Sequence, residues 1–264
     1  NAPFGTWPKD FDWESIRPPA GSSTYLSLSH SGRVDIFPNH GVVTKLYWDS
    51  AATVERIWNL MQLAGNCSVS LVGRLFLEPG STQVHGYTMP IETPIDTENF
   101  GTKNERIRLI YQLRDLLANL HSKNIVHGDI KPPNVLICSD GHPRFCDFDN
   151  ASVEGDGFVA TSMTYPYCST FRGRNETLPM TRAEDMHAMA MTMWEIYTGI
   201  KPLVLRGEDY EDVKFGLMDR CLVGFLPEME LIDDPEVASL IATFIAAGPE
   251  RPDVLERAPV YCVE

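Results

Sequence analysis

Three absences narrow the class of protein that this sequence can encode. No apolar run is long enough to span a membrane, because the most apolar stretch, residues 186–197, is interrupted by His187, Thr192 and Glu195. The six cysteines include no Cys-x-x-Cys pair, so no zinc site or redox motif is indicated. Lys and Arg number 22 against 36 Asp and Glu, and the resulting charge of −14 argues against a nucleic-acid partner.

The composition that remains is typical of a folded protein. Hydrophobic residues make up 43% of the 264 residues, which suffices for one large domain or two small lobes and argues against global disorder. Scattered cysteines favour a reduced protein, and residues 1–12 are proline-rich and lack the apolar segment of a signal peptide. We therefore expect an intracellular protein, in the cytoplasm or the nucleus.

The first third of the chain combines β-forming residues with one helical pattern. Alternating residues predict three short antiparallel strands over residues 25–29, 33–37 and 42–48. Apolar residues at helical spacing predict a helix over residues 51–64. Two more strands are expected at 69–77 and 83–89. Together these patterns predict a small sheet with one helix.

The rest of the chain is mainly helical. A strongly amphipathic helix is predicted over residues 103–122, and a hairpin follows between 135 and 146. Further helices are expected up to residue 199, near 209–220 and at 235–247. These elements predict an α+β fold of two lobes. We divide the chain into an N-terminal extension (1–24), an N-terminal lobe (25–90) and a C-terminal lobe (91–264).

Two short stretches carry the chemically active side chains. The first is His-Gly-Asp-Ile-Lys-Pro-Pro-Asn at residues 127–134, and the second is Cys-Asp-Phe-Asp at residues 146–149. Phosphoryl transfer needs a carboxylate that orients the attacking hydroxyl, oxygen ligands for Mg²⁺, and a cation beside the migrating group. The candidates are Asp129 as the base, Lys131 as the cation, and Asn134 and Asp147 as the metal ligands.

These stretches resemble the protein kinase catalytic loop, His-Arg-Asp-Leu-x-x-x-Asn, and the Asp-Phe-Gly motif that follows it. Val-Val-Thr-Lys-Leu at residues 42–46 resembles the kinase motif Val-Ala-Ile-Lys, and residues 194–202 resemble the end of the central kinase helix. Lys131 stands where serine/threonine kinases carry a lysine. The chain is therefore similar to a divergent, minimal serine/threonine kinase, and its short N-terminal lobe resembles lineage-specific families, for which we expect a fungal source.

The resemblance implies a bilobal kinase fold that holds ATP and Mg²⁺ between its lobes and takes a protein or peptide as its second substrate. A lysine inside an apolar strand needs an anionic partner. In kinases the nucleotide phosphates and a helix glutamate provide it, so Lys45 is expected to pair with Glu55, the only acidic residue of the predicted helix 51–64. The oligomeric state stays open.

The resemblance also places the nucleotide. By position, Met89 is the gatekeeper, and the main chain of Ile91 or Glu92 is expected to bond adenine, because a proline lacks the N–H donor. The kinase glycine-rich loop corresponds to residues 27–34, where Ser29 and Gly32 are the candidates for phosphate contacts.

Several positions depart from the kinase pattern. Residues 147–185 form a long irregular stretch that resembles the kinase activation segment. Gly128 replaces the arginine that in many kinases pairs with a phosphate on that segment, so we expect activity without such a phosphate. Asp149 replaces the glycine of Asp-Phe-Gly. Its carboxylate either recruits or shifts a Mg²⁺ or points to solvent, and we expect the latter. The Ala-Pro-Glu motif is absent, since residues 169–171 read Ser-Thr-Phe.

Two alternatives remain open. His-Gly-Asp and Asp-Phe-Asp are closer to the corresponding motifs of small-molecule phosphotransferases of the aminoglycoside or choline kinase type. The weak glycine-rich loop favours a nucleotide-binding pseudokinase scaffold. Lys131, the long segment after Asp147 and the helix end at 194–202 argue against the first alternative. The joint presence of Lys45, Asp129, Asn134 and Asp147 argues against the second.

Overall fold

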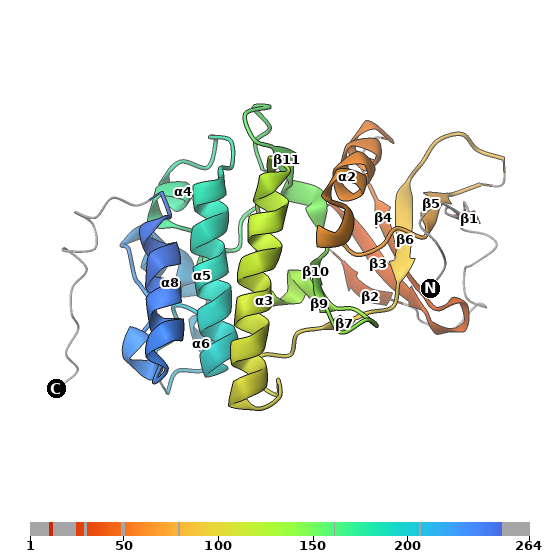
Figure 1. Ribbon diagram of the computed structural model, residues 1–264. Coiled ribbons are helices and arrows are strands. Elements are labelled where there is room, and N and C mark those ends of the chain that lie inside the picture. The colour runs from red at the N-terminus through yellow and green to blue at the C-terminus, as the bar shows by residue number, and fades with distance from the viewer. Residues whose placement is uncertain are drawn as a thin grey trace.

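The computed structural model describes residues 11–12, 25–28, 31–48, 51–78, 80–160, 162–205 and 207–249. A sheet-rich part and a helical part lie side by side along the long axis of the molecule (Figure 1). An antiparallel sheet with one helix is thus followed by a mainly helical region. The predicted α+β bilobal fold is confirmed.

The N-terminal part is built on a six-stranded sheet in the order β1-β5-β6-β4-β3-β2. Neighbouring strands are antiparallel, except that β1 runs parallel to β5. The strands are β1 (Phe11–Asp12), β2 (Tyr25–Leu28), β3 (Gly32–Phe37), β4 (Val42–Tyr47), β5 (Gly73–Phe76) and β6 (Gly86–Pro90). The β2-β3-β4 meander follows the prediction closely, whereas the sequence patterns did not predict β1.

Helix α2 (Ala51–Ala64) has the predicted bounds. Val54, Ile57, Trp58 and Met61 are buried, as the helical spacing indicated. The helix contacts strand β6 of the sheet and the 3-10 turn η4 (Phe148–Asn150) of the other lobe. It therefore lies where it can link the sheet to the Cys-Asp-Phe-Asp stretch.

Three long helices build the C-terminal part: α3 (Lys103–Ser122), α5 (Arg182–Thr198) and α8 (Pro235–Ala246). Helix α5 lies between the other two (Figure 1). Helix α3 begins at a capping box formed by Thr102 and Glu105, and α5 ends at Gly199, which has a left-handed φ of 75°. Met189 and Met193 of α5 are fully buried and fill the core.

Two small sheets position the chemically active stretches. Strands β7 (Thr93–Pro94), β9 (Val135–Ile137) and β10 (Pro143–Phe145) form one sheet, and β8 (Ile125–Val126) pairs with β11 (Ser152–Val153) in the other. The 3-10 turn η3 (Pro132–Asn134) leads into β9. The β9–β10 hairpin returns the chain to Asn134, because the Cys146 amide donates to the Asn134 carbonyl at 3.0 Å.

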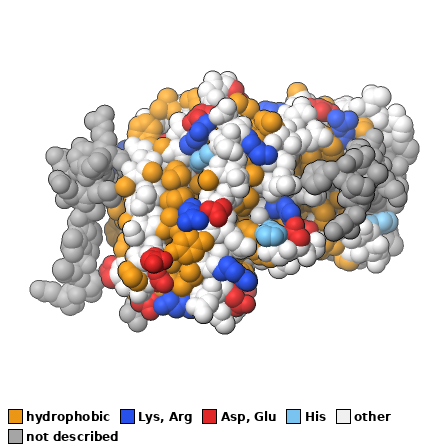
Figure 2. Space-filling model, viewed as in Figure 1, with side chains coloured by type: hydrophobic (Ala, Val, Ile, Leu, Met, Phe, Trp, Pro, Cys, Tyr) orange, Lys and Arg blue, Asp and Glu red, His pale blue; other side chains and the backbone are white. Residues whose placement is uncertain are grey.

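Short elements complete the fold: η1 (Pro38–His40), η2 (Gly65–Cys67), η5 (Tyr165–Tyr167), α4 (Thr170–Arg174), α6 (Tyr210–Val213), η6 (Lys214–Gly216), α7 (Leu217–Leu222) and η7 (Met229–Leu231). None of the described helices is both long and apolar enough to cross a membrane. Among the described residues on the face in Figure 2, basic and acidic side chains are interspersed, and no basic stripe crosses that face.

Candidate active site

Helix α5 holds the loop that carries Asp129. The buried Asp185 carboxylate accepts hydrogen bonds from the main-chain amides of His127, at 2.8 Å, and Gly128, at 2.9 Å. Its Oδ2 atom also lies 2.9 Å from Nε2 of His121 on α3. A buried carboxylate with several donors fixes its surroundings, so Asp185 fixes the start of this loop.

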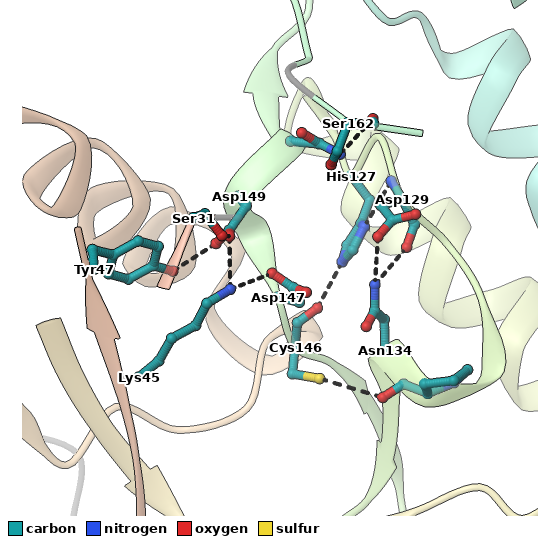
Figure 3. Close-up of polar contacts among 12 residues, drawn as sticks. Ser31, Lys45, Tyr47, His127, Asp129, Asn134, Cys146, Asp147, Asp149 and Ser162 are labelled. Carbon is teal, nitrogen blue, oxygen red and sulfur yellow. Dashed lines mark hydrogen bonds and ion pairs between the residues drawn. The ribbon is translucent and has the colours of Figure 1, made fainter. Parts of the chain in front are cut away.

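His127 joins the two active stretches. Its fully buried ring contacts Phe145 and Phe148, and the ring centroid of each lies 5.0 Å from that of His127. The ring atom Nε2 is 3.0 Å from the Cys146 carbonyl oxygen (Figure 3). The catalytic-loop residues and Asp147 are therefore parts of one packed unit.

Gly128 is required by the backbone conformation and by the close packing at this position. Its φ is 77°, in the left-handed region that favours glycine, and a Cβ added there would lie 2.5 Å from the Asn150 carbonyl oxygen. An arginine cannot stand at this position on the present backbone. The departure from His-Arg-Asp is thus matched by the local packing.

Three donors converge on the Asp129 carboxylate. Lys131 Nζ donates at 2.6 Å, Thr164 Oγ1 at 2.9 Å and Asn134 Nδ2 at 3.0 Å. Lys131 also donates to Thr164 Oγ1 at 2.8 Å. The activation segment is therefore tied through Thr164 to the catalytic loop. Charge-assisted bonds of this kind hold a carboxylate in one orientation.

The amide of Asn134 is oriented by the same group. Its Nδ2 atom donates to both the main-chain oxygen of Asp129, at 2.8 Å, and the Asp129 carboxylate. The nitrogen side of the amide thus faces Asp129, which leaves the amide oxygen to face elsewhere (Figure 3). An oxygen in that orientation suits a hard cation.

Lys45 lies at the junction of the lobes. It is 5% exposed, and its Nζ atom lies 2.6 Å from Asp147 Oδ1 and 2.7 Å from Asp149 Oδ2. Burial alone would lower the pKa of Lys45, but the neighbouring carboxylates, Asp147 foremost, outweigh it and hold the pKa well above its usual range. Lys45 is therefore a fully charged, buried cation.

The two carboxylates respond differently to this environment. Burial would raise the pKa of Asp147, but Lys45 outweighs burial and the pKa lies below its usual range. The pKa of Asp149 is raised, first by burial and then by the charge of Asp147. Asp147 is thus the carboxylate better suited to a metal ion, because its lowered pKa favours the ionised form.

Asp149 does not point to solvent, so that expectation was wrong. It accepts hydrogen bonds from Tyr47 Oη at 2.6 Å and Ser31 Oγ at 2.8 Å, besides its ion pair with Lys45 (Figure 3). The sequence carried a signal for Tyr47, because residues two apart on a strand share one face and Lys45 and Tyr47 both lie on β4. It gave no such signal for Ser31.

The expected pair between Lys45 and Glu55 is not formed in this structure. Glu55 is 40% exposed and lies 3.5 Å from Arg74 of β5, while Lys45 pairs with Asp147 and Asp149. The next residue of α2 faces inward instead. Arg56 donates to the main-chain oxygens of Asp149, at 2.6 Å, and Ala151, at 2.5 Å. The rotation of α2 about its axis therefore presents Arg56, and not Glu55, to the site.

The adenine-side expectations are met unevenly. Met89 is buried on β6. The Ile91 amide donates to the Gly41 carbonyl oxygen at 3.2 Å, so the expectation that it serves adenine was wrong for its N–H. The Glu92 carboxylate accepts from the Ser139 amide at 2.9 Å, which fixes the side chain and leaves its main chain as the candidate.

The glycine-rich loop position is only partly described. Ser29 lies outside the described residues. Gly32 lies on β3, where a Cβ would stand 2.1 Å from the Leu46 carbonyl oxygen of the neighbouring strand. Glycine is thus required there for close pairing of β3 with β4, whatever else the residue contacts.

The donor set fits a magnesium ion with a nucleotide. Asp147 offers an ionised carboxylate and Asn134 an amide oxygen, which are hard ligands. Among the described residues, no group of three or more His, Cys, Asp or Glu side chains could hold an ion unaided. Mg²⁺ commonly takes one or two protein oxygens and completes its shell with phosphates and water. This sparse set therefore suits an ion that arrives with phosphate groups.

Several known proteins with similar sequences are kinases. A probable serine/threonine-protein kinase, MRK1 homolog, of Encephalitozoon cuniculi is 41% identical over 81 residues, which are 30% of this chain and 24% of that protein. The MAP kinase kinase MKK1/SSP32 of Saccharomyces cerevisiae is 28% identical over 122 residues, 46% of this chain and 23% of that protein.

A third relative, the probable serine/threonine-protein kinase pknA2 of Bifidobacterium longum, is 26% identical over 121 residues, or 45% of this chain and 16% of that protein. The chain thus spans less than a quarter of the length of each of these relatives. Organisms this different single out no lineage, and a fungal source stays a prediction. The profile of the protein kinase domain matches residues 85–244, which is more than half of the chain. The chain belongs to the protein kinase domain family.

Proposed function

We propose that this chain is an ATP-dependent protein serine/threonine kinase, which transfers the γ-phosphoryl group of ATP to a hydroxyl of a protein substrate. The observation that carries the proposal is the convergence of Lys131, Thr164 and Asn134 on the Asp129 carboxylate. This arrangement holds a base in one orientation and ties it to the activation segment, against which a peptide would lie.

In the proposed reaction, Asp129 orients the substrate hydroxyl and accepts its proton late in the transfer. The hydroxyl oxygen forms a bond to the γ-phosphorus while the bond from that phosphorus to the β,γ-bridging oxygen breaks, and ADP leaves. Lys131 Nζ, bonded to Asp129, provides positive charge beside the migrating group. Mg²⁺, when bound, would neutralise charge on the phosphates.

The remaining expectations become proposals about binding. We propose that Asn134 and Asp147 hold the metal, and that Lys45 meets the nucleotide phosphates. The Glu92 main chain, next to Met89 and Ile91, is proposed to meet adenine. The proposed lobes are residues 25–90 and 91–264, with ATP between them, and residues 1–24 as an extension.

A small-molecule phosphotransferase is the second candidate, favoured by the Asp-Phe-Asp wording and by the carboxylate of Asp149 beside Lys45. The bond between Thr164 and Asp129 favours the protein kinase, because it gives the activation segment a role at the base. Radiolabelled ATP, offered with a mixture of peptides and separately with aminoalcohols and sugars, separates the two. Label in the small molecules alone would refute the protein kinase proposal.

A pseudokinase scaffold would bind partners without transfer. Thermal denaturation with ATP, with and without Mg²⁺, tests this alternative. The kinase proposal predicts a Mg²⁺-dependent rise in melting temperature, because a ligand that binds only the folded state stabilises it. Label transfer in the assay above then distinguishes a nucleotide-binding scaffold from an enzyme.

A further inference from the structure

We propose that Asp149 is the positioning residue for Lys45, and that Tyr47 holds Asp149 for this purpose. Glu55, the helix carboxylate, has no part in holding the lysine. The inference rests on the proposed function, since the position of Lys45 affects catalysis only if Lys45 meets the nucleotide phosphates. It adds two residues, Asp149 and Tyr47, to those that the expected catalytic set contains.

The geometry assigns Lys45 two carboxylates on one short turn. Asp147 and Asp149 are the second and the last residue of the Cys-Asp-Phe-Asp stretch, and each has an oxygen within 2.7 Å of Lys45 Nζ (Figure 3). An ammonium group has three N–H donors. Two are directed to these carboxylates, and no third hydrogen bond of the ammonium group is formed with the described residues, so one N–H donor is proposed to meet a phosphate.

Two carboxylates position the lysine better than one. With Asp147 as its only partner, Lys45 would be drawn towards the residue proposed to bind the metal. Asp149 pulls the ammonium group from a second direction and keeps it between the two. A buried cation also needs nearby negative charge to offset the cost of removing it from water, and Asp149 contributes part of that charge.

Asp149 is itself fixed from the N-terminal sheet. Tyr47 lies two residues after Lys45 on β4, is 3% exposed, and donates to Asp149 Oδ1 at 2.6 Å. Ser31, which precedes β3, donates to Oδ2 at 2.8 Å. The carboxylate therefore receives bonds from a strand and a loop of one lobe while belonging to the other lobe. Its orientation is set by these hydroxyls and not by solvent.

The helix carboxylate is engaged elsewhere. Glu55 pairs with Arg74 on the outer side of α2, and Arg56 of the same helix binds the main-chain oxygens of Asp149 and Ala151. Helix α2 thus supports the Asp149 turn through its main chain. The helix contributes no carboxylate to Lys45 in this arrangement.

The first test needs no nucleotide. Double-mutant cycles on urea unfolding would combine Lys45→Met with Asp149→Asn, and Lys45→Met with Glu55→Gln. Lys45→Met lowers the folding equilibrium constant by some factor in each background. We expect this factor to be about fivefold larger in the wild type than in the Asp149→Asn variant. In the Glu55→Gln background its effect should match that in the wild type within about twofold. Coupling to Glu55 in place of Asp149 would overturn the assignment.

The second test measures how the position of Lys45 affects the KM and kcat for MgATP. Asp149→Asn should raise the KM for MgATP about tenfold with a smaller change in kcat, and Tyr47→Phe should raise it less. In the Asp149→Asn background Tyr47→Phe should have no further effect, because the tyrosine acts through the carboxylate. Asp149→Glu should recover part of the loss. Asp115→Asn, which removes an exposed carboxylate on α3, is the matched control and should leave KM unchanged.

The outcomes separate the inference from the proposed function. If the wild type transfers phosphate and the Asp149→Asn variant has the same KM for MgATP as the wild type, the positioning role is refuted while the kinase proposal stands. If the unfolding cycle shows the coupling but the wild type neither binds nor turns over MgATP, the kinase proposal fails. Asp149 would then be a structural tie between the lobes, and its positioning role would be refuted with it. A lower melting temperature of the Asp149→Asn and Tyr47→Phe variants with an unchanged KM would also refute that role.

Discussion

The two sides of the candidate site differ in how closely they follow the kinase pattern. On the catalytic-loop side, Asp129, Lys131 and Asn134 lie within six consecutive residues and bond one another as the pattern implies. On the sheet side, Lys45 pairs with Asp149, whereas the expected partner Glu55 pairs with Arg74. The difference lies in the distance along the chain: contacts within one loop are set locally, whereas Lys45 meets residues 102 and more positions away.

This contrast shows which parts of a divergent kinase can change together. The catalytic loop is fixed by Asp185 beneath it and by the packed ring of His127, so a change there would disturb several bonds at once. On the sheet side a carboxylate can be provided by either of two elements. Asp149 replaces the glycine of Asp-Phe-Gly in the same chain in which Glu55 of α2 pairs with Arg74. In the proposed arrangement the first change compensates the second.

The largest effect is expected from breaking the catalytic-loop side at its centre. Asp129→Asn removes the base and keeps the shape of the side chain, so kcat should fall about 1,000-fold, or about 4 kcal/mol of transition-state stabilisation. Affinity for MgATP should stay within about twofold, since Asp129 is not a nucleotide ligand in the proposal. Kinetics and calorimetry on the same preparation measure both. Turnover equal to that of the wild type would remove Asp129 from the mechanism.

The next largest effect concerns the fold of the same loop. Gly128→Ala places a Cβ 2.5 Å from the Asn150 carbonyl oxygen at a φ of 77°, and should cost about 3 kcal/mol of unfolding free energy. Gly141→Ala is the matched control, because Gly141 has a φ of 80° with no atom within 4 Å of the added Cβ. It should cost only about 1 kcal/mol. Equal losses in urea unfolding would show that packing at Gly128 is unimportant.

A smaller effect sharpens the metal side of the comparison. Asp147→Asn replaces a carboxylate by an amide, and a hard cation prefers the carboxylate. Affinity for MgATP should fall about tenfold, or about 1.4 kcal/mol, while affinity for ATP without Mg²⁺ changes less. Calorimetric titrations with and without Mg²⁺ give both values. Equal MgATP affinity in the variant and the wild type would exclude Asp147 as the metal ligand.

No effect is expected from removing phosphate. Gly128 offers no cation to a phosphate on the activation segment. Arg174 donates to the main-chain oxygen of Leu222 and Arg182 pairs with Glu154, while Arg172 is buried and donates through Nη1 to the main-chain oxygen of Leu178. Phosphatase-treated protein should therefore transfer phosphate as fast as untreated protein. A loss of about tenfold or more would mean that one of these arginines, or another cation, takes up a phosphate.

Sequence patterns predicted the fold well where periodicity is strong. The helices at 51–64 and 103–122 have the predicted bounds, because each carries an uninterrupted apolar stripe. Residues 69–72, expected in a strand, precede β5, which begins only at Gly73. The strand β1 was missed because two residues carry no periodic signal.

The candidate site was predictable only within its loop. The short spacing from Asp129 to Asn134 places the residues on one turn, so their proximity follows from the sequence. The partner of Lys45 depends on how far α2 is rotated on the sheet, which a helical pattern does not define. Glu55 and Arg56 are adjacent in sequence but face different ways. The sequence named Ile91 or Glu92 as the main-chain partner of adenine, and it carries no signal for the hydrogen bond between the Ile91 amide and the Gly41 carbonyl oxygen.

The most direct measurement of the central claim is single-turnover transfer from γ-labelled ATP to a peptide mixture, with the protein in excess over nucleotide. The proposed function predicts label on peptide serine or threonine, dependent on Mg²⁺ and lost in Asp129→Asn. Label that stays in ATP, or that reaches water alone, with folded wild-type protein and saturating peptide would contradict it.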